Sequence, residues 1–581
     1  MVAEFSPVMA YTPSSWDLSK IQPHDHSFKE IEKATTALEA QRKKLTSTIS
    51  PHDFLAILKE VEKLKIQSNT LSCYAYLRFA ENTSDQEATA FMSKVETFLA
   101  KISNCLLFFN LWFKELPEKK AQELIHTSGR YHYFLEYLRK TKAYTLKENE
   151  EKIITIKDVT GVSALNTIYN ILTSQFEFEF AGKKVTQEEL LNFVRDPSAE
   201  KRESAYRTLL SPYVKHKDVL GEIYKNLIND WREENMGLRG YKSPLHVRNI
   251  VNDIPDEAVD VLLRVCEKNQ HLFHRFFELK RKRLGVKKLR RFDLYAPLQE
   301  EKEKIAYDAA VKMVIQAYES FSPRFKKEAL AILNADNVHS LVQKNKMTGA
   351  FCMSVNAQCS PFVLLSYTGK LRDVFTLAHE LGHGVHHNLA REQTEFTFHA
   401  PLPLAETASI FGEMLLSEKL LREKPEAAKE MLFLKVDDLY ASIIRQSSFV
   451  MFEKKAHKMM EEGKTILEMS EVYLADLKKQ LGKNVEVDDI FAYEWCYIPH
   501  IFHTPFYCYA YAFGNLLTLA LYEMYKVKGE PFAVKIIELL SKGGSESPVS
   551  MTKSLGIDIT SEQFWQKGFT VIEEMIEKME G

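Results

Sequence analysis

Several features are absent or scarce in this sequence, and each absence excludes a class of protein. The first residues, MVAEFSPVMAYTPSSW, contain no basic stretch followed by an apolar run, and no later stretch of about 18 residues is apolar and uncharged. These absences argue against a secretory leader and a membrane helix. The seven cysteines are scattered without a C-x-x-C pair, as is typical of proteins from a reducing compartment. We therefore expect a cytoplasmic protein that does not bind a membrane.

The chain also lacks an excess of charge of either sign. Its 77 basic and 79 acidic residues leave a formal net charge of -2, so there is no electrostatic reason to expect a polyanion as partner. One basic cluster at residues 281–291 contains no aromatic residue that could stack on a base. We interpret this cluster as a solvated helix end and loop, and we do not expect nucleic acid as a partner.

Apolar residues at helical spacing dominate most of the 581 residues. A chain of this length is expected to form more than one packed region. The Pro197-Ser198 dipeptide is interpreted as an interhelical loop near a soft domain boundary. We predict a mainly α protein, a large multi-helix body with an N-terminal helical domain over residues 1–195 and a catalytic domain over residues 196–581.

Two segments depart from the helical pattern. Residues 176–185 (FEFEFAGKKV) alternate and turn at Ala181-Gly182, which predicts a short hairpin followed by a helix with a capping box at Thr186. Residues 350–355 and 362–367 are two β-prone runs, which predict a small sheet just before the next helix. The first run could bind an extended peptide through an open strand edge, and a covered strand is the alternative.

The helix expected to begin near Asp373 contains the motif H-E-x-x-H, from His379 to His383. Two histidines four residues apart on a helix lie on one face, so both imidazoles can reach one ion at about 2.0–2.1 Å. Glu380 beside them is placed to take a proton from the attacking water. The pattern alone arises by chance in roughly one in twenty chains of this length. Its apolar neighbours predict a buried helix, where a zinc ion satisfies these groups better than the alternative of two hydrogen-bonded core histidines.

A catalytic zinc site needs a third protein ligand and one open position. Residue 389, where an extended motif would place a third histidine, is leucine. Glu406 and Glu413 share a face of the next predicted helix, so one of them should bind the metal and the other could orient a histidine ligand. We favour Glu406 as the ligand. Glu392 and Glu395 compete by distance but lie in a more polar connection.

Other histidines and tyrosines could contribute to the site. His386 and His387 extend the motif by one turn, and we leave them outside the ligand set because such neighbours more often pack or form hydrogen bonds. Residues 499–514 (PHIFHTPFYCYAYAFG) are rich in histidine and tyrosine, and Tyr507 and Tyr511 would share a helix face. Hydroxyl or imidazole groups there could donate hydrogen bonds to the oxyanion of amide hydrolysis. An aromatic core stripe is the alternative interpretation.

At these residues the sequence resembles the oligoendopeptidase F family, which is related to thimet oligopeptidase among the gluzincin-type metallopeptidases. The matching stretches are LTSQFEF (172–178), GAFC (349–352), FTLAHELGHGVHH (375–387), AETAS (405–409) and HIFHTPFYCYAYAFG (500–514). They occur in the order typical of the family and span most of the chain. The resemblance implies a helical body that encloses a deep substrate channel, and cytosolic cleavage of oligopeptides in preference to folded proteins.

The resemblance also implies roles for individual residues. One zinc ion per chain would be held by His379, His383 and Glu406, with Glu380 as the base. Donors to the transition state would come from the C-terminal cluster, where His500, Tyr507 and Tyr511 are the candidates in more than one register. The presence of Ile501 and His503 departs from the family's usual HFY..PFY pattern.

The expected function is that of a zinc-dependent endopeptidase with oligopeptide substrates. A carboxypeptidase-type exopeptidase is the alternative within enzymes, and a non-catalytic, zinc-containing, peptide-binding scaffold is the alternative outside them. For the oligomeric state we favour a monomer.

Overall fold

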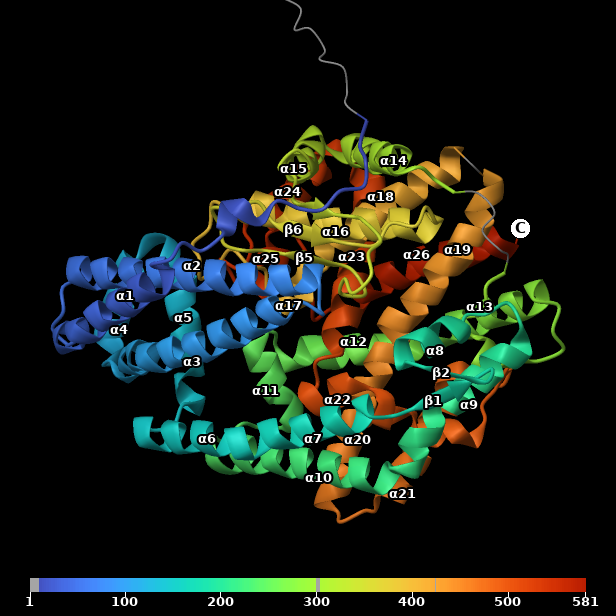
Figure 1. The fold of residues 1–581 in the computed structure, drawn as a ribbon, viewed down its shortest axis with the longest axis horizontal. Coiled ribbons are helices and arrows are strands. Elements are labelled where there is room, and N and C mark those ends of the chain that lie inside the picture. Colours follow the sequence, from blue (N-terminus) through green and yellow to red (C-terminus); the bar gives the residue numbers. More distant parts are fainter. Residues whose placement is uncertain (1–9, 299–303, 424, 581) are drawn as a thin grey trace, which may run out of the picture. The chain divides into compact units, whose positions relative to one another are not determined.

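The structure is a computed structural model that describes residues 10–298, 304–423 and 425–580 (Figure 1). Helices dominate these residues, and the strands form only two two-stranded sheets and one three-stranded sheet in the described part of the chain. This confirms the predicted mainly α fold with a small sheet beside the H-E-x-x-H helix. Among the described residues, no helix has both the length and the apolar character required to cross a lipid bilayer.

The chain divides into two compact units, each built from three separate segments. Unit 1 comprises residues 1–142, 301–419 and 524–555, and unit 2 comprises residues 143–300, 420–523 and 556–581. Two of the crossings between the units fall within helices, α18 (Thr407–Glu423) and α23 (Tyr509–Lys528). The predicted division between residues 195 and 196 stays a prediction about domains.

Unit 1 begins with a bundle of long helices. Ser50 caps the second of these helices by accepting a hydrogen bond from the Asp53 amide, and Pro51 occupies its first turn. Stacked phenylalanines, among them Phe54 and Phe109 with ring centroids 6.2 Å apart, fill the centre of the bundle. The helices of this bundle are α1 (Ser27–Gln41), α2 (Pro51–Glu81), α3 (Gln86–Glu115), α4 (Glu118–Thr127) and α5 (His132–Lys140).

The rest of unit 1 surrounds one central helix, α16 (Leu371–Ala390), which carries the H-E-x-x-H motif. It packs against α14, α15, α24 and the strands β5 and β6 (Figure 1). This environment explains why α16 is apolar on nearly every side. The bounds are α14 (Tyr307–Phe321), α15 (Pro323–Leu333), α17 (Leu402–Ala405), α24 (Glu530–Ser541) and α25 (Pro548–Lys553).

The predicted small sheet is present in unit 1 with one more strand than expected. Its order is β4 (Val338–His339), β6 (Phe362–Leu364) and β5 (Phe351–Met353). Strand β5 is antiparallel to β6, with Cys352 opposite Val363, whereas β4 is parallel to β6. Strand β5, which comes from the first predicted run, therefore lies at an edge of the sheet.

Unit 2 contains the predicted hairpin and most of the C-terminal helices. The hairpin pairs β1 (Phe178–Phe180) with β2 (Lys183–Val185), and Ala181 and Gly182 in the turn have φ of 51° and 74°. Thr186 and Glu189 then form the predicted capping box of the next helix. A short parallel pair joins β3 (Leu289–Arg290) to β7 (Val485–Glu486).

The helices of unit 2 pack around aromatic residues such as Trp495 and Trp565, both fully buried. The helices from the first segment are α6 (Glu148–Thr160), α7 (Val162–Ser174), α8 (Gln187–Phe193), α9 (Ala199–Lys215), α10 (Lys217–Arg232), α11 (Pro244–Val251), α12 (Asp256–Lys268) and α13 (Gln270–Arg283). The later segments add α19 (Pro425–Leu439), α20 (Arg445–Glu461), α21 (Ile466–Leu481), α22 (Pro499–His503) and α26 (Glu562–Glu580).

Candidate metal centre

The helix that carries the motif starts at a well-defined cap. The carboxylate of Asp373 accepts hydrogen bonds from the backbone amides of Thr368 and Lys370, so the first turn of α16 is fixed two residues before the position expected from the sequence. From this start, one face of α16 presents His379 and His383 one turn apart, with ring centroids 4.8 Å apart. Both imidazoles are half-buried.

Glu406 joins the two histidines in one group. Its Oε2 atom lies 3.4 Å from Nε2 of His379 and 3.3 Å from Nε2 of His383, and the two Nε2 atoms are 3.2 Å apart. Among the described residues, no second trio of His, Cys, Asp or Glu side chains converges in this way. The structure thus brings together the three residues that the sequence predicts as metal ligands.

The spacing of these three atoms fits one small cation. Ligand atoms at about 2.0–2.1 Å in tetrahedral geometry lie roughly 3.3–3.4 Å from one another, which matches the observed 3.2–3.4 Å. The donor set of two imidazoles and one carboxylate is one that zinc accepts in catalytic sites. Such a set contributes three ligands and leaves a fourth tetrahedral position for a non-protein ligand.

The electrostatics of the site favour a positive charge between these side chains. Burial by itself lowers the pKa of His379, but the carboxylates of Glu413 and Glu406 outweigh it and raise the pKa to about 9. Burial would raise the pKa of Glu406, but the two histidines outweigh it and lower the pKa to about 2. A divalent cation would supply the positive charge that these carboxylates stabilise.

Two further residues hold the ligands in place. Nδ1 of His379 lies 2.6 Å from Oε1 of Glu413, so this carboxylate orients the ring with Nε2 toward Glu406. The hydroxyl of Ser409 donates a 2.9 Å hydrogen bond to Oε2 of Glu406. An orienting glutamate is expected from the sequence, whereas Ser409 is not. The available signal was its position three residues after Glu406.

Glu406 does not lie within a continuous helix, contrary to the expectation from sequence. The helix is interrupted at this residue, which lies in a turn between α17 (Leu402–Ala405) and α18 (Thr407–Glu423). The break places Glu406 at the start of α18, and α18 approaches α16 closely enough that a Cβ on Gly382 would lie 2.6 Å from Cα of Ser409. Glycine at this position therefore permits the two helices to pack backbone against backbone.

Glu380, the predicted base, is buried next to the two histidines on α16. Its burial raises the pKa of its carboxyl group, while the neighbouring His379 and His383 act in the opposite direction. The thiol of Cys352 on β5 interacts electrostatically with this carboxylate. The edge strand of the sheet therefore lies near the proposed base.

The residues that competed for the ligand role bind elsewhere. Glu395 accepts hydrogen bonds from the side chain of Asn69 and the amide of Ala357. His387 contacts the carbonyl of Cys359 at 2.8 Å, and burial lowers the pKa of both His386 and His387 to about 4. Neither these histidines nor Glu392 is part of the three-residue group.

The predicted oxyanion donors also form a cluster, which belongs to unit 2. The Tyr511 hydroxyl lies 3.3 Å from Nε2 of His500, and the rings of His500 and Tyr507 stack with centroids 5.7 Å apart. Burial lowers the pKa of His500, and its neighbours His503 and Arg445 lower it further. Burial and these neighbours therefore favour the neutral form of the His500 imidazole.

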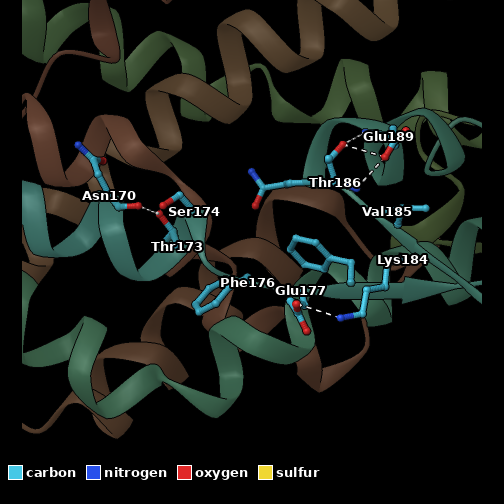
Figure 2. Close-up of a pocket in the computed structure, with 11 residues that line it drawn as sticks. Asn170, Thr173, Ser174, Phe176, Glu177, Lys184, Val185, Thr186 and Glu189 are labelled. Atoms are coloured by element: carbon cyan, nitrogen blue, oxygen red, sulfur yellow. Dashed lines mark hydrogen bonds and ion pairs between the residues drawn. The ribbon is translucent and has the colours of Figure 1, made fainter. Parts of the chain in front are cut away.

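Close by in unit 2, a pocket of about 610 Å³ lies between the end of α7 and the hairpin (Figure 2). Asn170 and Glu189 line opposite sides, and the exposed side chains of Glu177 and Lys184, which also line the pocket, form a 3.0 Å ion pair. Oδ1 of Asn170 lies 3.0 Å from Nε2 of His503, so one wall of the pocket contacts the segment that carries His500. None of the predicted site residues lines this pocket.

Comparison with known proteins places the chain in a family. The family model described as Peptidase family M3 matches residues 192–571, and the one described as Oligopeptidase F matches residues 112–178. Oligopeptidase PepF of Bacillus subtilis is 24% identical over 97% of this chain and 87% of its own length. An oligoendopeptidase F homolog of Lactococcus lactis subsp. lactis is 25% identical over 97% of this chain and 96% of its own length.

A solved structure shows the same fold. Oligoendopeptidase-F from Enterococcus faecium superposes with a TM-score of 0.73 at 21% identity, covering 96% of this chain and 98% of that one. The resemblance stated from the sequence is thus confirmed by family, relatives and fold. Because the Peptidase family M3 model matches more than half of this chain, the chain belongs to peptidase family M3 and is a peptidase.

Proposed function

We propose that this chain is a zinc-dependent endopeptidase that cleaves oligopeptides, with Glu380 as general base. The observation that carries the proposal is the trio of His379, His383 and Glu406, whose ligand atoms lie 3.2–3.4 Å apart beside a buried glutamate. The names of the relatives, oligopeptidase and oligoendopeptidase, support internal cleavage of short peptides.

His379, His383 and Glu406 would hold the zinc ion, which when bound supplies a Lewis acid that polarises the scissile carbonyl group. Glu380 takes a proton from the attacking water and then passes it to the leaving amine. Burial of Glu380 raises the pKa of its carboxyl group and so makes it a stronger base than an exposed glutamate. Glu413 keeps His379 in the tautomer that presents Nε2.

Two other features of the chain would serve the same reaction. His500, Tyr507 and Tyr511 would donate hydrogen bonds to the oxyanion, and the contacts among their side chains support a shared role. Strand β5 (Phe351–Met353), at the edge of its sheet, would pair with the backbone of an extended substrate. Backbone pairing depends little on the substrate's sequence, as suits a general oligopeptidase.

The direct test is Glu380→Gln. This variant keeps a side chain of the same size and leaves the three ligands intact, so we expect it to bind zinc in full and to lose nearly all turnover. Metal content is measured by elemental analysis, and turnover with an internally quenched fluorescent peptide, with and without a chelator. Undiminished cleavage by Glu380→Gln would show that another group is the base.

Product mapping tests the kind of cleavage separately. Mass spectrometry of the fragments from one mid-length peptide should show internal cuts from the first turnovers onward. Stepwise loss of C-terminal residues would instead indicate a carboxypeptidase. Peptide binding without any cleavage by the zinc-loaded protein would indicate a scaffold.

A further inference from the structure

A buried residue in an unusual backbone conformation precedes the predicted donor Tyr507. Phe506 has φ of 58°, the left-handed region that non-glycine residues seldom adopt, and its side chain is fully buried. Such a conformation persists only where surrounding contacts impose it. The residue thus marks a point where unit 2 holds its backbone against the local preference.

Three contacts within unit 2 impose this conformation. The amide of Phe506 donates a 2.8 Å hydrogen bond to Oε1 of Glu453, and Nε of Arg248 donates to the carbonyl of Pro505 at 3.2 Å. The ring of His457 lies 4.8 Å from the ring of Phe506. Glu453 and His457 are four residues apart on α20 (Arg445–Glu461), so one face of this helix contacts both the backbone and the side chain of Phe506.

The conformation of Phe506 sets the direction in which the chain continues to Tyr507. The turn is closed by the backbone amide of Tyr507, which donates a hydrogen bond to the carbonyl of Thr504 at 3.2 Å. The backbone carbonyl of Tyr507 in turn accepts a hydrogen bond from the amide of Ala510, where α23 begins. A change of φ at Phe506 would therefore move the Tyr507 ring away from His500, on which it stacks.

Glu453 is an improbable residue for its position unless this contact matters. It is 1% exposed on a helix face that an apolar side chain could fill, and its second oxygen, Oε2, has no hydrogen-bond partner among the described residues. A buried carboxyl group with an unsatisfied oxygen destabilises the folded state. The proposed reaction does not use Glu453 directly, and the hydrogen bond to the Phe506 amide is the contact that gives its carboxyl group a role.

We propose that Glu453 is a positioning residue, which holds the Phe506 turn and thereby places the Tyr507 hydroxyl for donation to the oxyanion. This inference rests on the proposed function to the extent that Tyr507 is an oxyanion donor. It adds a residue on a separate helix to the machinery, one that would act through the backbone.

Glu453→Leu and Glu453→Gln form the first pair of variants. Leucine removes the acceptor for the Phe506 amide, and we expect kcat to fall about 100-fold, as for a catalytic group displaced by about 1 Å. KM should stay within two-fold, because substrate binding elsewhere is unchanged. Glutamine keeps an acceptor oxygen at the same reach, so kcat should stay within two-fold of the original protein.

A double-mutant cycle with Tyr507→Phe distinguishes positioning from general damage. If Glu453 acts through Tyr507, then Glu453→Leu in the Tyr507→Phe background should lower kcat less than three-fold further. Multiplication of the two losses would overturn the proposal. The proposal would also be overturned if Glu453→Leu left kcat unchanged while Tyr507→Phe lowered it. That outcome would leave the proposed function intact. Unchanged kcat in Tyr507→Phe would remove the donor role itself and with it this inference.

Two further variants separate an effect on catalysis from an effect on protein stability. Asp437→Asn alters another buried acid of unit 2, which pairs with Lys280, and should lower the melting temperature without changing kcat. Arg248→Ala removes the second contact to the turn from a partly exposed position, and should lower kcat at least five-fold with KM unchanged. If Glu453→Leu does not fold, an unchanged kcat in Arg248→Ala overturns the proposal.

Discussion

At the scale of single residues, one carboxylate determines which nitrogen of His379 faces the other two candidate metal ligands. Glu413 lies 2.6 Å from Nδ1 and so directs the Nε2 lone pair toward Glu406. We expect Glu413→Ala to weaken zinc binding by about 10–100-fold, the usual effect of removing such a partner. Competition with a fluorescent chelator measures the affinity.

The matched control for this prediction is Glu392→Ala. Glu392 is an exposed acid shortly after the same helix and was a competing ligand on sequence grounds. Its replacement should leave zinc affinity unchanged. A loss of affinity in Glu392→Ala equal to that in Glu413→Ala would contradict the assigned roles.

The buried carboxyl group of Glu453 makes the stability of the folded protein depend on pH. Burial raises its pKa from 4.5 to about 8, so the folded protein retains a proton that the unfolded chain releases above its lower pKa. The stabilising contribution is full below pH 4.5 and is lost as pH rises through 8. Arg248 opposes this shift, while Tyr224 and Cys508 are the other titratable groups that face the carboxyl group.

Glu453→Gln cannot ionise, so the free energy of unfolding of the variant should not show this decline. As pH rises from 5 to 8.5, the free energy of unfolding of the variant should therefore increase relative to that of the original protein. The total increase should be roughly 1.4 kcal/mol for each pKa unit by which folding shifts Glu453. Denaturant titrations at several pH values measure the difference. A difference that does not vary with pH would show that Glu453 keeps an ordinary pKa.

The candidate metal ligands could be proposed from sequence to the extent that their chemistry is local. Helical spacing places His379 and His383 on one face, whereas Glu406 was favoured among several acids because a third ligand was needed, and the structure brings it to the two histidines. Ser409 and Glu453 were not predicted, because a serine or glutamate on a helix has no distinctive pattern. Their roles depend on contacts to Glu406 and Phe506 that only the folded chain creates.

At the scale of elements, the close approach of α16 and α18 determines the geometry of the candidate metal site. A Cβ on Gly382 would lie 2.6 Å from Cα of Ser409 and 2.7 Å from the carbonyl oxygen of Ala408, both backbone atoms that cannot rotate away. Gly382→Ala should therefore push α18 from α16 and displace Glu406. We expect zinc affinity to fall at least ten-fold, as measured by chelator competition.

Gly384→Ala on the same helix provides the comparison. A Cβ there would meet Cδ1 of Ile332, the far end of a flexible side chain. We expect this variant to lose less zinc affinity than Gly382→Ala, because Ile332 can change rotamer. Equal losses in the two variants would indicate that any added methyl group on α16 disrupts the site.

Elements with strong local signals were predicted with nearly correct bounds. The hairpin turn at Ala181-Gly182 and the capping box at Thr186 depend on adjacent residues and appear as expected. The break at Glu406 was missed because residues 404–413 contain no proline that would mark the end of a helix. Strand β4 was also missed, since two residues give no periodic pattern and its pairing with β6 spans more than 20 residues.

At the scale of the whole molecule, the two compact units could not be predicted from local patterns. Each is assembled from three segments, and two of the boundaries between them fall inside α18 and α23 rather than in loops. A search for linkers rich in proline and glycine favours boundaries such as the one near Pro197, because it assumes that domains are continuous in sequence. The way in which helices pack into the units depends on their faces and lengths together.

Because the candidate metal site lies within unit 1, removal of a bound metal is expected to affect that unit more than unit 2. All three ligands, Glu413 and Ser409 belong to unit 1, so bound zinc would stabilise the folded state of that unit. A ligand at 100 times its dissociation constant contributes about 2.7 kcal/mol. Chelation should therefore lower the melting temperature by a few degrees. It should also increase hydrogen exchange in α16 and α18.

The exchange pattern decides whether the stabilisation originates at these ligands. Amides of α20 and α21 in unit 2 should keep their protection after chelation, because the ligand atoms make no contribution to that unit's core. In Glu406→Ala, α16 should exchange faster from the start, and added zinc should restore little protection because one of three ligands is missing. If added zinc fully restored the protection of α16 in Glu406→Ala, the third ligand would have to be another residue. If chelation reduced protection equally in both units, the metal would stabilise the chain as a whole.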